Sequence, residues 1–190
     1  MVEPENAAPF GSSRPNDNGT TASDAAIIPI GQPPLIMSRS RVFISYSHVD
    51  RRFLDRLHVF LRPLERKGLV DWWDDTRLKA GSNWREEIRQ AVASAKVAVL
   101  LISADFFASE FIQTNELPPL LEAARQDDAV LLSVILQPVN LGDSPLAEFQ
   151  AINDPQRPLG KLRTKAGRDE VWLKLTQAIE AALAPPSAKG

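Results

Sequence analysis

Polar side chains that could bind or transform a ligand gather where the first apolar run of the chain ends. The segment 41–50, RVFISYSHVD, brings Ser45, Tyr46, Ser47 and Asp50 to the point where a helical pattern begins. In open α/β sheets, ligands bind beyond the carboxyl ends of the strands, so these side chains are candidates for a ligand site. A second reading is open, because Ser47 and Asp50 also fit the Ser/Thr-x-x-acid pattern of a helix cap.

A cluster of aspartates accompanies the next apolar run. Asp71, Asp74 and Asp75 flank the pair Trp72 and Trp73. Carboxylates at this place hold magnesium in response regulators whose sheets have the same strand order, but fold analogy alone does not assign a function. The two tryptophans favour a packed strand, and we expect no metal site here.

Composition excludes several classes of site. The chain has no cysteine, and His48 and His58 are its only histidines, so thiol nucleophiles, cysteine-type zinc sites and histidine-rich metal sites are absent. Neither a G-x-S-x-G nucleophile elbow nor a glycine-rich phosphate loop occurs. A formal net charge of -2 gives no electrostatic footprint for nucleic acid, and we predict no direct nucleic-acid partner. Any metal site would have to use carboxylates alone.

The hydrophobic pattern predicts the elements that must position these groups. Apolar residues recur at helical spacing in three stretches, namely Phe53, Leu57, Phe60 and Leu64; Trp84, Ile88, Val92 and Ala95; and Val171, Leu175, Ile179 and Ala182. Continuous apolar runs at 96–102 and 130–136 predict central parallel strands, with shorter strands at 69–73 and 150–152. Strands that alternate with helices predict a flavodoxin-like, three-layer α/β fold with a five-stranded parallel sheet in the order 2-1-3-4-5.

Two prolines interrupt the segment between the two central strands. This segment holds Ser109 as a predicted helix cap, then Glu116, and then Pro118 and Pro119. A proline inside a helix loses a hydrogen bond and disfavours helical geometry just before it. We therefore expect the helix that carries Glu116 to bend or restart before Leu120.

The ends of the chain differ in composition from its middle. Residues 1–40 hold six of the 15 prolines and few large apolar side chains, which predicts a disordered leader. Residues 41–183 form the predicted domain, and 184–190 form a predicted disordered tail. No apolar run is long enough for a membrane span and no secretory signal is evident, so we expect a cytoplasmic protein without a membrane partner.

Four separate blocks of the predicted domain carry a family resemblance. They are FISYSHVD at 43–50, LVDWWDDTRLKAGSNW at 69–84, VAVLLISADFFASEF at 97–111 and NELPPLLEAA at 115–124. Together they resemble a Toll/interleukin-1 receptor (TIR) domain of the bacterial type, and the similarity extends over about residues 40–183. The resemblance implies a five-stranded parallel sheet, a mobile loop at about 74–84, and either homotypic assembly or cleavage of NAD.

The resemblance also implies a catalytic residue. TIR domains of this type carry a catalytic glutamate on the helix after the third strand, and Glu116 matches it. Ser109 and Phe111 match the Ser-x-aromatic stretch that precedes this glutamate. Many relatives place a tryptophan four residues before the glutamate, whereas this chain has Ile112 there and Phe111 five residues before. Either the helix geometry shifts or the aromatic ring contributes less.

A single carboxylate suffices for the cleavage of NAD. Nicotinamide leaves as a neutral base from a positively charged ring nitrogen, so no general acid is required, unlike in ordinary glycoside hydrolysis. The carboxylate would bind a hydroxyl of the nicotinamide ribose and stabilise the oxocarbenium-like charge that develops at the anomeric carbon. NAD is then the substrate, and we expect no other cofactor.

Other residues have supporting roles in this interpretation. We expect six residues to contact the substrate: Phe43, Ser45, Tyr46, Ser47, Trp84 and Phe111. We expect four residues to act in the loop after the second strand and in assembly with a partner: Asp75, Arg77, Lys79 and Gly81. Each set has an ordinary alternative, because phenylalanine and tryptophan often serve the core and charged loop residues are usually solvated.

Two functions from different classes are therefore open. The first is an NAD glycohydrolase that releases nicotinamide and either ADP-ribose or a cyclic variant. Its activity would be switched on by self-association or by another TIR-containing protein, in bacterial immunity or signalling. The second is a non-catalytic adaptor that binds another TIR domain through the loop after the second strand. The presence of Glu116 favours the first.

Overall fold

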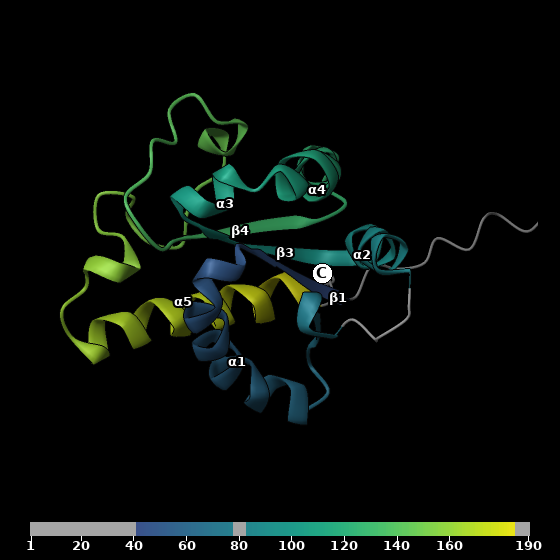
Figure 1. Ribbon diagram of the computed structural model, residues 1–190. Coiled ribbons are helices and arrows are strands. Elements are labelled where there is room, and N and C mark those ends of the chain that lie inside the picture. The colour runs from purple at the N-terminus through teal and green to yellow at the C-terminus, as the bar shows by residue number, and fades with distance from the viewer. Residues whose placement is uncertain (1–40, 78–82, 185–190) are drawn as a thin grey trace, which may run out of the picture. The chain divides into compact units, whose positions relative to one another are not determined.

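The computed structural model describes residues 41–77 and 83–184, which form a parallel sheet with helices on both faces (Figure 1). The predicted leader at 1–40 and the predicted loop residues Lys79 and Gly81 lie outside the described residues. So do all residues of the predicted tail except the first.

Four parallel strands form the sheet. They are β1 (Arg41–Tyr46), β2 (Asp71–Trp73), β3 (Ala95–Ile102) and β4 (Val130–Ile135), and they lie in the order β2-β1-β3-β4. This arrangement confirms the predicted α/β class and the predicted order of these strands. Strand β3 is apolar along most of its length because helices cover both of its faces.

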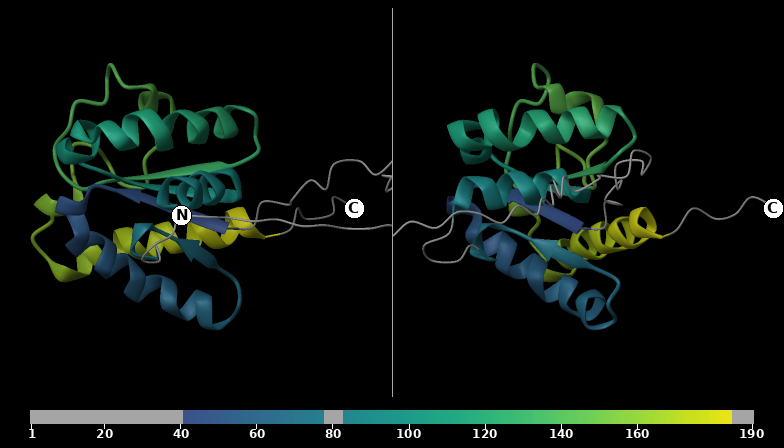
Figure 2. Two further views of the ribbon diagram at one scale, coloured as in Figure 1. Left: turned by 45° about the vertical axis from the view of Figure 1, so that its right-hand side comes forward. Right: turned by 90° about the vertical axis from the view of Figure 1, so that its right-hand side faces the viewer.

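The helices form two layers, which Figures 1 and 2 show above and below the sheet. One layer contains α1 (Arg51–Arg66) and α5 (Lys165–Leu183), whose apolar residues share a core with one face of the strands. The other layer contains α2 (Trp84–Ala93), α3 (Ala104–Ala108) and α4 (Leu117–Arg125), which share a second core with the opposite face. Among the described residues, no helix combines the length and the apolar character needed to cross a bilayer.

The alternation of side chains along β1 decides which layer each residue meets. Ile44 and Tyr46 belong to the core shared with α1 and α5, whereas Phe43 belongs to the core shared with α2 and α4. Ser45 lies between Ile44 and Tyr46 and therefore points toward the layer that contains α4. A polar side chain at the carboxyl end of a central strand is thus directed at the segment that carries Glu116.

The predicted fifth strand at 150–152 is reduced to a single bridge. Ala151 pairs with Ser133 of β4, and Ile152 N donates to Ser133 O at 2.8 Å. One residue farther along, the side-chain amide of Asn153 takes the place of a peptide group. Its Oδ1 accepts from Ile135 N at 2.9 Å, and its Nδ2 donates to Ile135 O at 3.1 Å. The sheet therefore has four strands where five were predicted, because the weak edge strand expected at 150–152 is one bridge and the Asn153 side chain satisfies the edge of β4 beyond it.

Because the Asn153 side chain bonds to Ile135 where a strand was expected, we expect Asn153→Ala to destabilise the fold. Ile135 is fully buried, and its N–H loses this acceptor in the variant. A buried, unpaired polar group costs about 1–3 kcal/mol, so we expect the free energy of unfolding to fall by that amount in a denaturant titration. Asn140→Ala is the control, because the exposed Asn140 Oδ1 accepts from Gly142 N and the loss should stay within about 0.5 kcal/mol. Equal losses in the two variants would contradict the assignment.

Candidate functional site

A cavity of about 450 Å³ opens at the carboxyl end of β1. This volume lies within the range of small-molecule sites. Its walls come from β1 and the turn after it, from the end of β2, from α2 and from the segment before α4. The lining residues are Phe43, Ile44, Ser45, Tyr46, Ser47, His48, Trp73, Asp75, Trp84, Ile88, Ser109, Phe111, Ile112 and Glu116.

Glu116 ends a π-helical turn, η3 (Ile112–Glu116), that lies directly before α4. In this turn Leu117 N donates to Ile112 O, five residues back. A new helix then begins at Leu117, and Pro118 and Pro119 occupy its first positions, where proline loses no intrahelical bond. The predicted restart before Leu120 is confirmed.

The π-helical turn accounts for the unusual spacing between Phe111 and Glu116. A π-helical bond spans one residue more than an α-helical bond, so a residue five positions back takes the place that a residue four positions back has in an α-helix. Both Phe111 and Glu116 line the cavity. The geometry of the helix has shifted, and the aromatic ring remains at the site.

The carboxyl group of Glu116 is buried and faces Ser45. Glu116 is 8% exposed, and Ser45 Oγ donates to its Oε2 at 2.5 Å. Burial raises the pKa of Glu116 from its ordinary value of 4.5 to about 7, and the charge of Asp75 adds to this rise. The hydrogen bond from Ser45 acts in the opposite direction, because it stabilises the ionised form. The cavity therefore contains a carboxyl group that titrates near neutral pH.

A second carboxylate, that of Asp75, lies at the same cavity. It belongs to η2 (Asp75–Arg77), the turn that follows β2. Its Oδ1 accepts from Tyr46 Oη at 2.7 Å, and its Oδ2 lies 3.0 Å from His48 Nε2. Burial, followed by the hydrogen bond to Asp75, raises the pKa of Tyr46 above its ordinary value. Tyr46 therefore remains a neutral donor and fixes Asp75 at the wall of the cavity.

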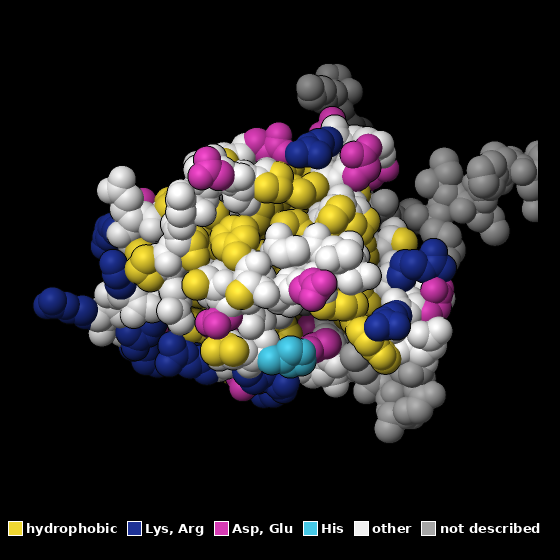
Figure 3. Space-filling model, turned by 45° about the horizontal axis from the view of Figure 1, so that its top comes forward, with side chains coloured by type: hydrophobic (Ala, Val, Ile, Leu, Met, Phe, Trp, Pro, Cys, Tyr) yellow, Lys and Arg dark blue, Asp and Glu magenta, His cyan; other side chains and the backbone are white. Residues whose placement is uncertain are grey.

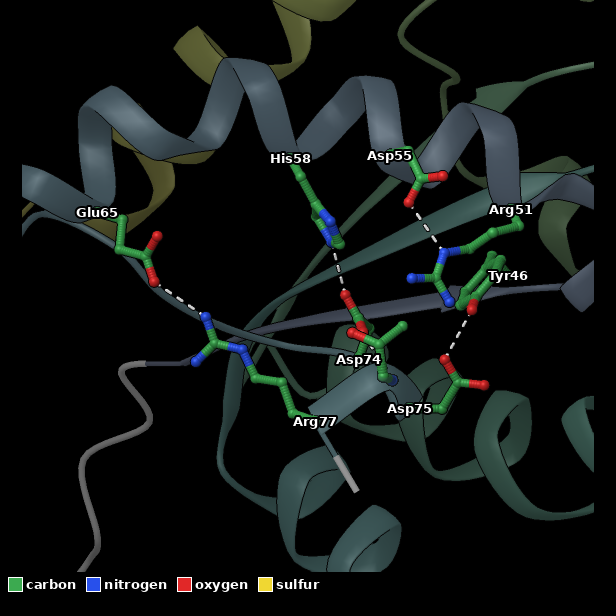
Figure 4. A network of polar contacts seen from close by, with 9 residues as sticks. Tyr46, Arg51, Asp55, His58, Glu65, Asp74, Asp75 and Arg77 are labelled. Carbon is green, nitrogen blue, oxygen red and sulfur yellow. Dashed lines mark hydrogen bonds and ion pairs between the residues drawn. The ribbon is translucent and has the colours of Figure 1, made fainter. Parts of the chain in front are cut away.

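A polar network holds η2 against α1, as Figure 4 shows. The fully buried carboxylate of Asp74 accepts from Thr76 N at 2.8 Å and lies 2.7 Å from His58 Nε2. Burial alone would raise the pKa of Asp74, but the hydrogen bonds from His58 and Thr76 outweigh it and lower the pKa. His58 also stacks on Trp72, with ring centroids 4.2 Å apart.

Arg77 completes this network on the side away from the cavity. Its guanidinium lies 3.7 Å from the ring centroid of Trp72, and its Nη2 donates to Glu65 at 2.9 Å (Figure 4). Arg77 does not line the cavity. The network fixes the chain on both sides of Asp75, so Asp75 is positioned by α1 as well as by Tyr46.

The helix-cap reading of Ser47 and Asp50 was wrong. The Ser47 side chain makes no cap bond, and Asp50 instead accepts from Ser103 Oγ at 2.5 Å. Asp50 and Ser103 are both buried, and burial raises the pKa of Asp50. Ser103 Oγ in turn accepts from Phe106 N and caps α3. Asp50 thus links the start of α1 to the end of β3 and leaves the Ser47 side chain at the cavity wall.

Two pairs of aromatic rings form the apolar walls. Phe43 and Trp73 stack with centroids 5.6 Å apart, and Trp84 and Phe111 meet at a tilt with centroids 5.1 Å apart. Trp84 is 42% exposed, so its ring lies at the mouth of the cavity. Flat apolar walls beside a few polar groups suit a ligand that contains an aromatic ring.

The family model for the TIR domain matches residues 42–163 of this chain. The chain belongs to the TIR domain family. Its fold is also similar to the crystal structure of the TIR domain of the Toll-related receptor TRR-2 from Hydra magnipapillata, with a TM-score of 0.50 and 20% sequence identity. That similarity covers 73% of this chain and 96% of the receptor domain.

Relatives of this TIR domain include proteins with enzymatic names. It is 32% identical over 93 residues to the NAD(+) hydrolase TcpA of a Theionarchaea archaeon. This match covers 49% of this chain and 27% of that protein. It is 37% identical over 70 residues to a probable 2' cyclic ADP-D-ribose synthase, TcpO of Methanobrevibacter olleyae, which is 37% of this chain and 20% of that protein. The chain spans less than half the length of the curated relatives it matches.

The cavity of the TIR domain brings most of the predicted site residues together. All six predicted substrate contacts line it, as do Glu116 and Asp75. Asp75 was expected to serve the loop and assembly, whereas it lies at the cavity with Tyr46. Sequence reasoning did not assign Trp73 and Ile88 to the site, although the alternation along β2 and the apolar face of α2 indicate their direction. Within 41–77 and 83–184, no group of three histidine, aspartate or glutamate side chains could hold a metal ion.

The raised pKa of Glu116 predicts a dependence of stability on pH. Because the pKa is higher in the folded state than in the unfolded state, ionisation of Glu116 destabilises the fold as pH rises from about 4.5 through about 7. We expect Glu116→Gln to be more stable than the parent by up to about 3 kcal/mol at pH 8 and nearly equal to it at pH 4.5. Denaturant titrations at the two pH values measure this difference.

Glu110→Gln is the matched control, because Glu110 is an exposed glutamate on the same segment. It should change the free energy of unfolding by the same small amount at both pH values. A gain for Glu116→Gln that does not depend on pH would contradict the burial of an ionisable carboxyl group at this position.

Proposed function

We propose that this TIR domain is an NAD glycohydrolase that cleaves the bond between nicotinamide and ribose. The observation that carries the proposal is the carboxyl group of Glu116, which is buried at the wall of a cavity and bonded to Ser45. Among the described residues, no lysine or arginine forms an ion pair with it. A buried carboxylate without a cation destabilises a fold, so a catalytic role explains its presence better than a structural role does.

Glu116 acts on the charge that develops as the glycosidic bond breaks. The electron pair of the C–N bond leaves with the ring nitrogen, so the nicotinamide cation departs as a neutral base. The anomeric carbon takes up positive charge, which the ionised Glu116 stabilises from a fixed position in the cavity. Water then adds to this carbon and loses a proton, which gives ADP-ribose. A hydroxyl or base nitrogen of the same molecule in place of water gives a cyclic variant.

Other groups of the cavity orient the substrate. The Ser45 hydroxyl keeps the Glu116 carboxyl group at one position, and the ring pair Phe43–Trp73 contributes an apolar wall for nicotinamide. The hydroxyl of Ser47 is available for the ribose, because it is not used in a helix cap. NAD serves as substrate in this proposal, and the chemistry requires no further cofactor.

The names of these relatives, among them an NAD(+) hydrolase and a probable 2' cyclic ADP-D-ribose synthase, support NAD as the substrate. Uncontrolled loss of NAD would be toxic, so we propose that assembly with a second copy or another TIR-containing protein activates the domain, in the cytoplasm and in bacterial immunity or signalling. The alternative of a non-catalytic adaptor gives no reason to bury Glu116 in a cavity.

The test of the proposed function is the release of nicotinamide from NAD by the parent protein and by Glu116→Gln. The parent should release nicotinamide, at a rate per molecule that rises with protein concentration if assembly activates it. Glu116→Gln should lose at least about 100-fold, since preorganised electrostatic groups contribute about that much or more. Chromatography of the products also separates linear from cyclic ADP-ribose. Glu110→Gln should retain parental activity, and an inactive parent under crowded conditions would favour the adaptor.

The pH dependence of kcat/KM provides a second test. Because the ionised form of Glu116 is the active one, kcat/KM should rise as pH increases through about 7 in the free enzyme. Ser45→Ala removes the hydrogen bond that favours the ionised form, so this rise should move to higher pH. A parent profile that is flat between pH 5 and 9, or an unshifted profile for Ser45→Ala, would contradict the role of Glu116.

A further inference from the structure

We propose that a second cavity, which shares a wall with the first, binds the pyrophosphate of the dinucleotide, and that Arg85 is its main ligand. This inference rests on the proposed function, because it extends the substrate from the reacting ribose to the phosphates. The second cavity has a volume of about 390 Å³ and lies beside α2. Ile88 and Phe111 line both cavities.

The need for a separate subsite follows from the charge of the first cavity. Among the described residues, its lining includes the carboxyl groups of Glu116 and Asp75 but no lysine or arginine. Such a cavity suits the positively charged nicotinamide riboside half of NAD. It opposes the pyrophosphate, which carries two negative charges, so the phosphates must lie where cations are available.

The second cavity supplies those cations, and in the described part of the chain its two arginines outnumber its one carboxyl group, that of Glu86. Arg85 and Arg89 both line it, and they lie four residues apart on α2, which places them on one face of the helix. Arginine offers two parallel donors to a phosphate group. Figure 3 shows an exposed histidine (cyan) with acidic side chains (magenta) beside it. To its right, Lys and Arg side chains (dark blue) lie next to hydrophobic side chains (yellow).

Contacts between side chains connect the two cavities in steps. Phe111 meets Trp84 with centroids 5.1 Å apart, and the guanidinium carbon of Arg85 lies 4.9 Å from the ring centroid of Trp84. A substrate with its reacting ribose at Glu116 would therefore pass Phe111 and Trp84 before it reaches Arg85. The order of the groups matches the order of nicotinamide, ribose and pyrophosphate in NAD.

Arg85 is the better phosphate ligand of the two arginines. Arg89 donates through Nε and Nη2 to Glu86, at 2.8 Å in both bonds, so a carboxylate already neutralises it. In the part of the chain that the structure describes, Arg85 makes its cation–π contact with Trp84 and no ion pair. Asn83 adds a polar group at the start of α2, because its side chain makes no cap bond.

The closing experiment compares substrates with and without the pyrophosphate. Arg85→Ala should lower kcat/KM for NAD by about 10- to 100-fold, mainly through KM, since a hydrogen-bonded charged group contributes about 1.5–3 kcal/mol. It should leave the cleavage of nicotinamide riboside unchanged, because that molecule has no phosphate. Arg52→Ala is the matched control and should alter neither, since Arg52 is an exposed arginine over the ring of Phe53, away from both cavities.

A binding experiment tests this inference separately from the proposed function. Calorimetry with ADP-ribose on the catalytically impaired Glu116→Gln background should show binding that Arg85→Ala weakens about 10-fold or more and that added salt also weakens. This result would support the subsite even if the parent releases no nicotinamide. In that case only the proposed function would fail. Absence of ADP-ribose binding, equal binding with and without Arg85, or equal loss on NAD and nicotinamide riboside would overturn the subsite.

Discussion

The burial of one carboxyl group against a strand end is the constraint on which the site depends. Ser45 Oγ donates to Glu116 Oε2 at 2.5 Å, although the two residues are 71 positions apart in the sequence. Burial disfavours its ionised form, and within the described residues no cation offsets that cost. The remaining stability must come from the two apolar cores on either side of β1 and β3, which rigidly carry the pair. The site is therefore a local departure from stability that the rest of the fold tolerates.

The chain around this pair is shaped by polar contacts that fix its backbone. Asp50 links the start of α1 to Ser103 at the end of β3, and Asp74 links the turn after β2 to His58 of α1. Both carboxyl groups are buried and bonded, which keeps them away from the cavity while they hold its walls. Asp75, which follows Asp74 in the chain, lines the cavity instead, and its charge adds to the rise in the pKa of Glu116.

Sequence patterns were sufficient where a local rule decides the structure. The continuous apolar runs at 96–102 and 130–136 predicted the two central strands, and Pro118 and Pro119 predicted the new helix at Leu117. They were insufficient where a contact between distant segments overrides the local rule. Ser47 and Asp50 have the spacing of a helix cap, but Asp50 bonds to Ser103, which no local pattern contains. The predicted edge strand gave way to the Asn153 side chain for the same reason, since its partner Ile135 lies 18 positions away.

The sequence by itself determined the α/β class, the parallel order of the main strands and the identity of the candidate catalytic glutamate, because periodicity and family motifs are local properties of the chain. Only the tertiary structure decided that Ser45 bonds to Glu116 and that Asp75 lies at the cavity. It also decided that a π-helical turn returns Phe111 to the site and that Arg85 lies beside it. These features arise from contacts between distant segments, and burial, pKa and charge complementarity exist only once those segments are packed together.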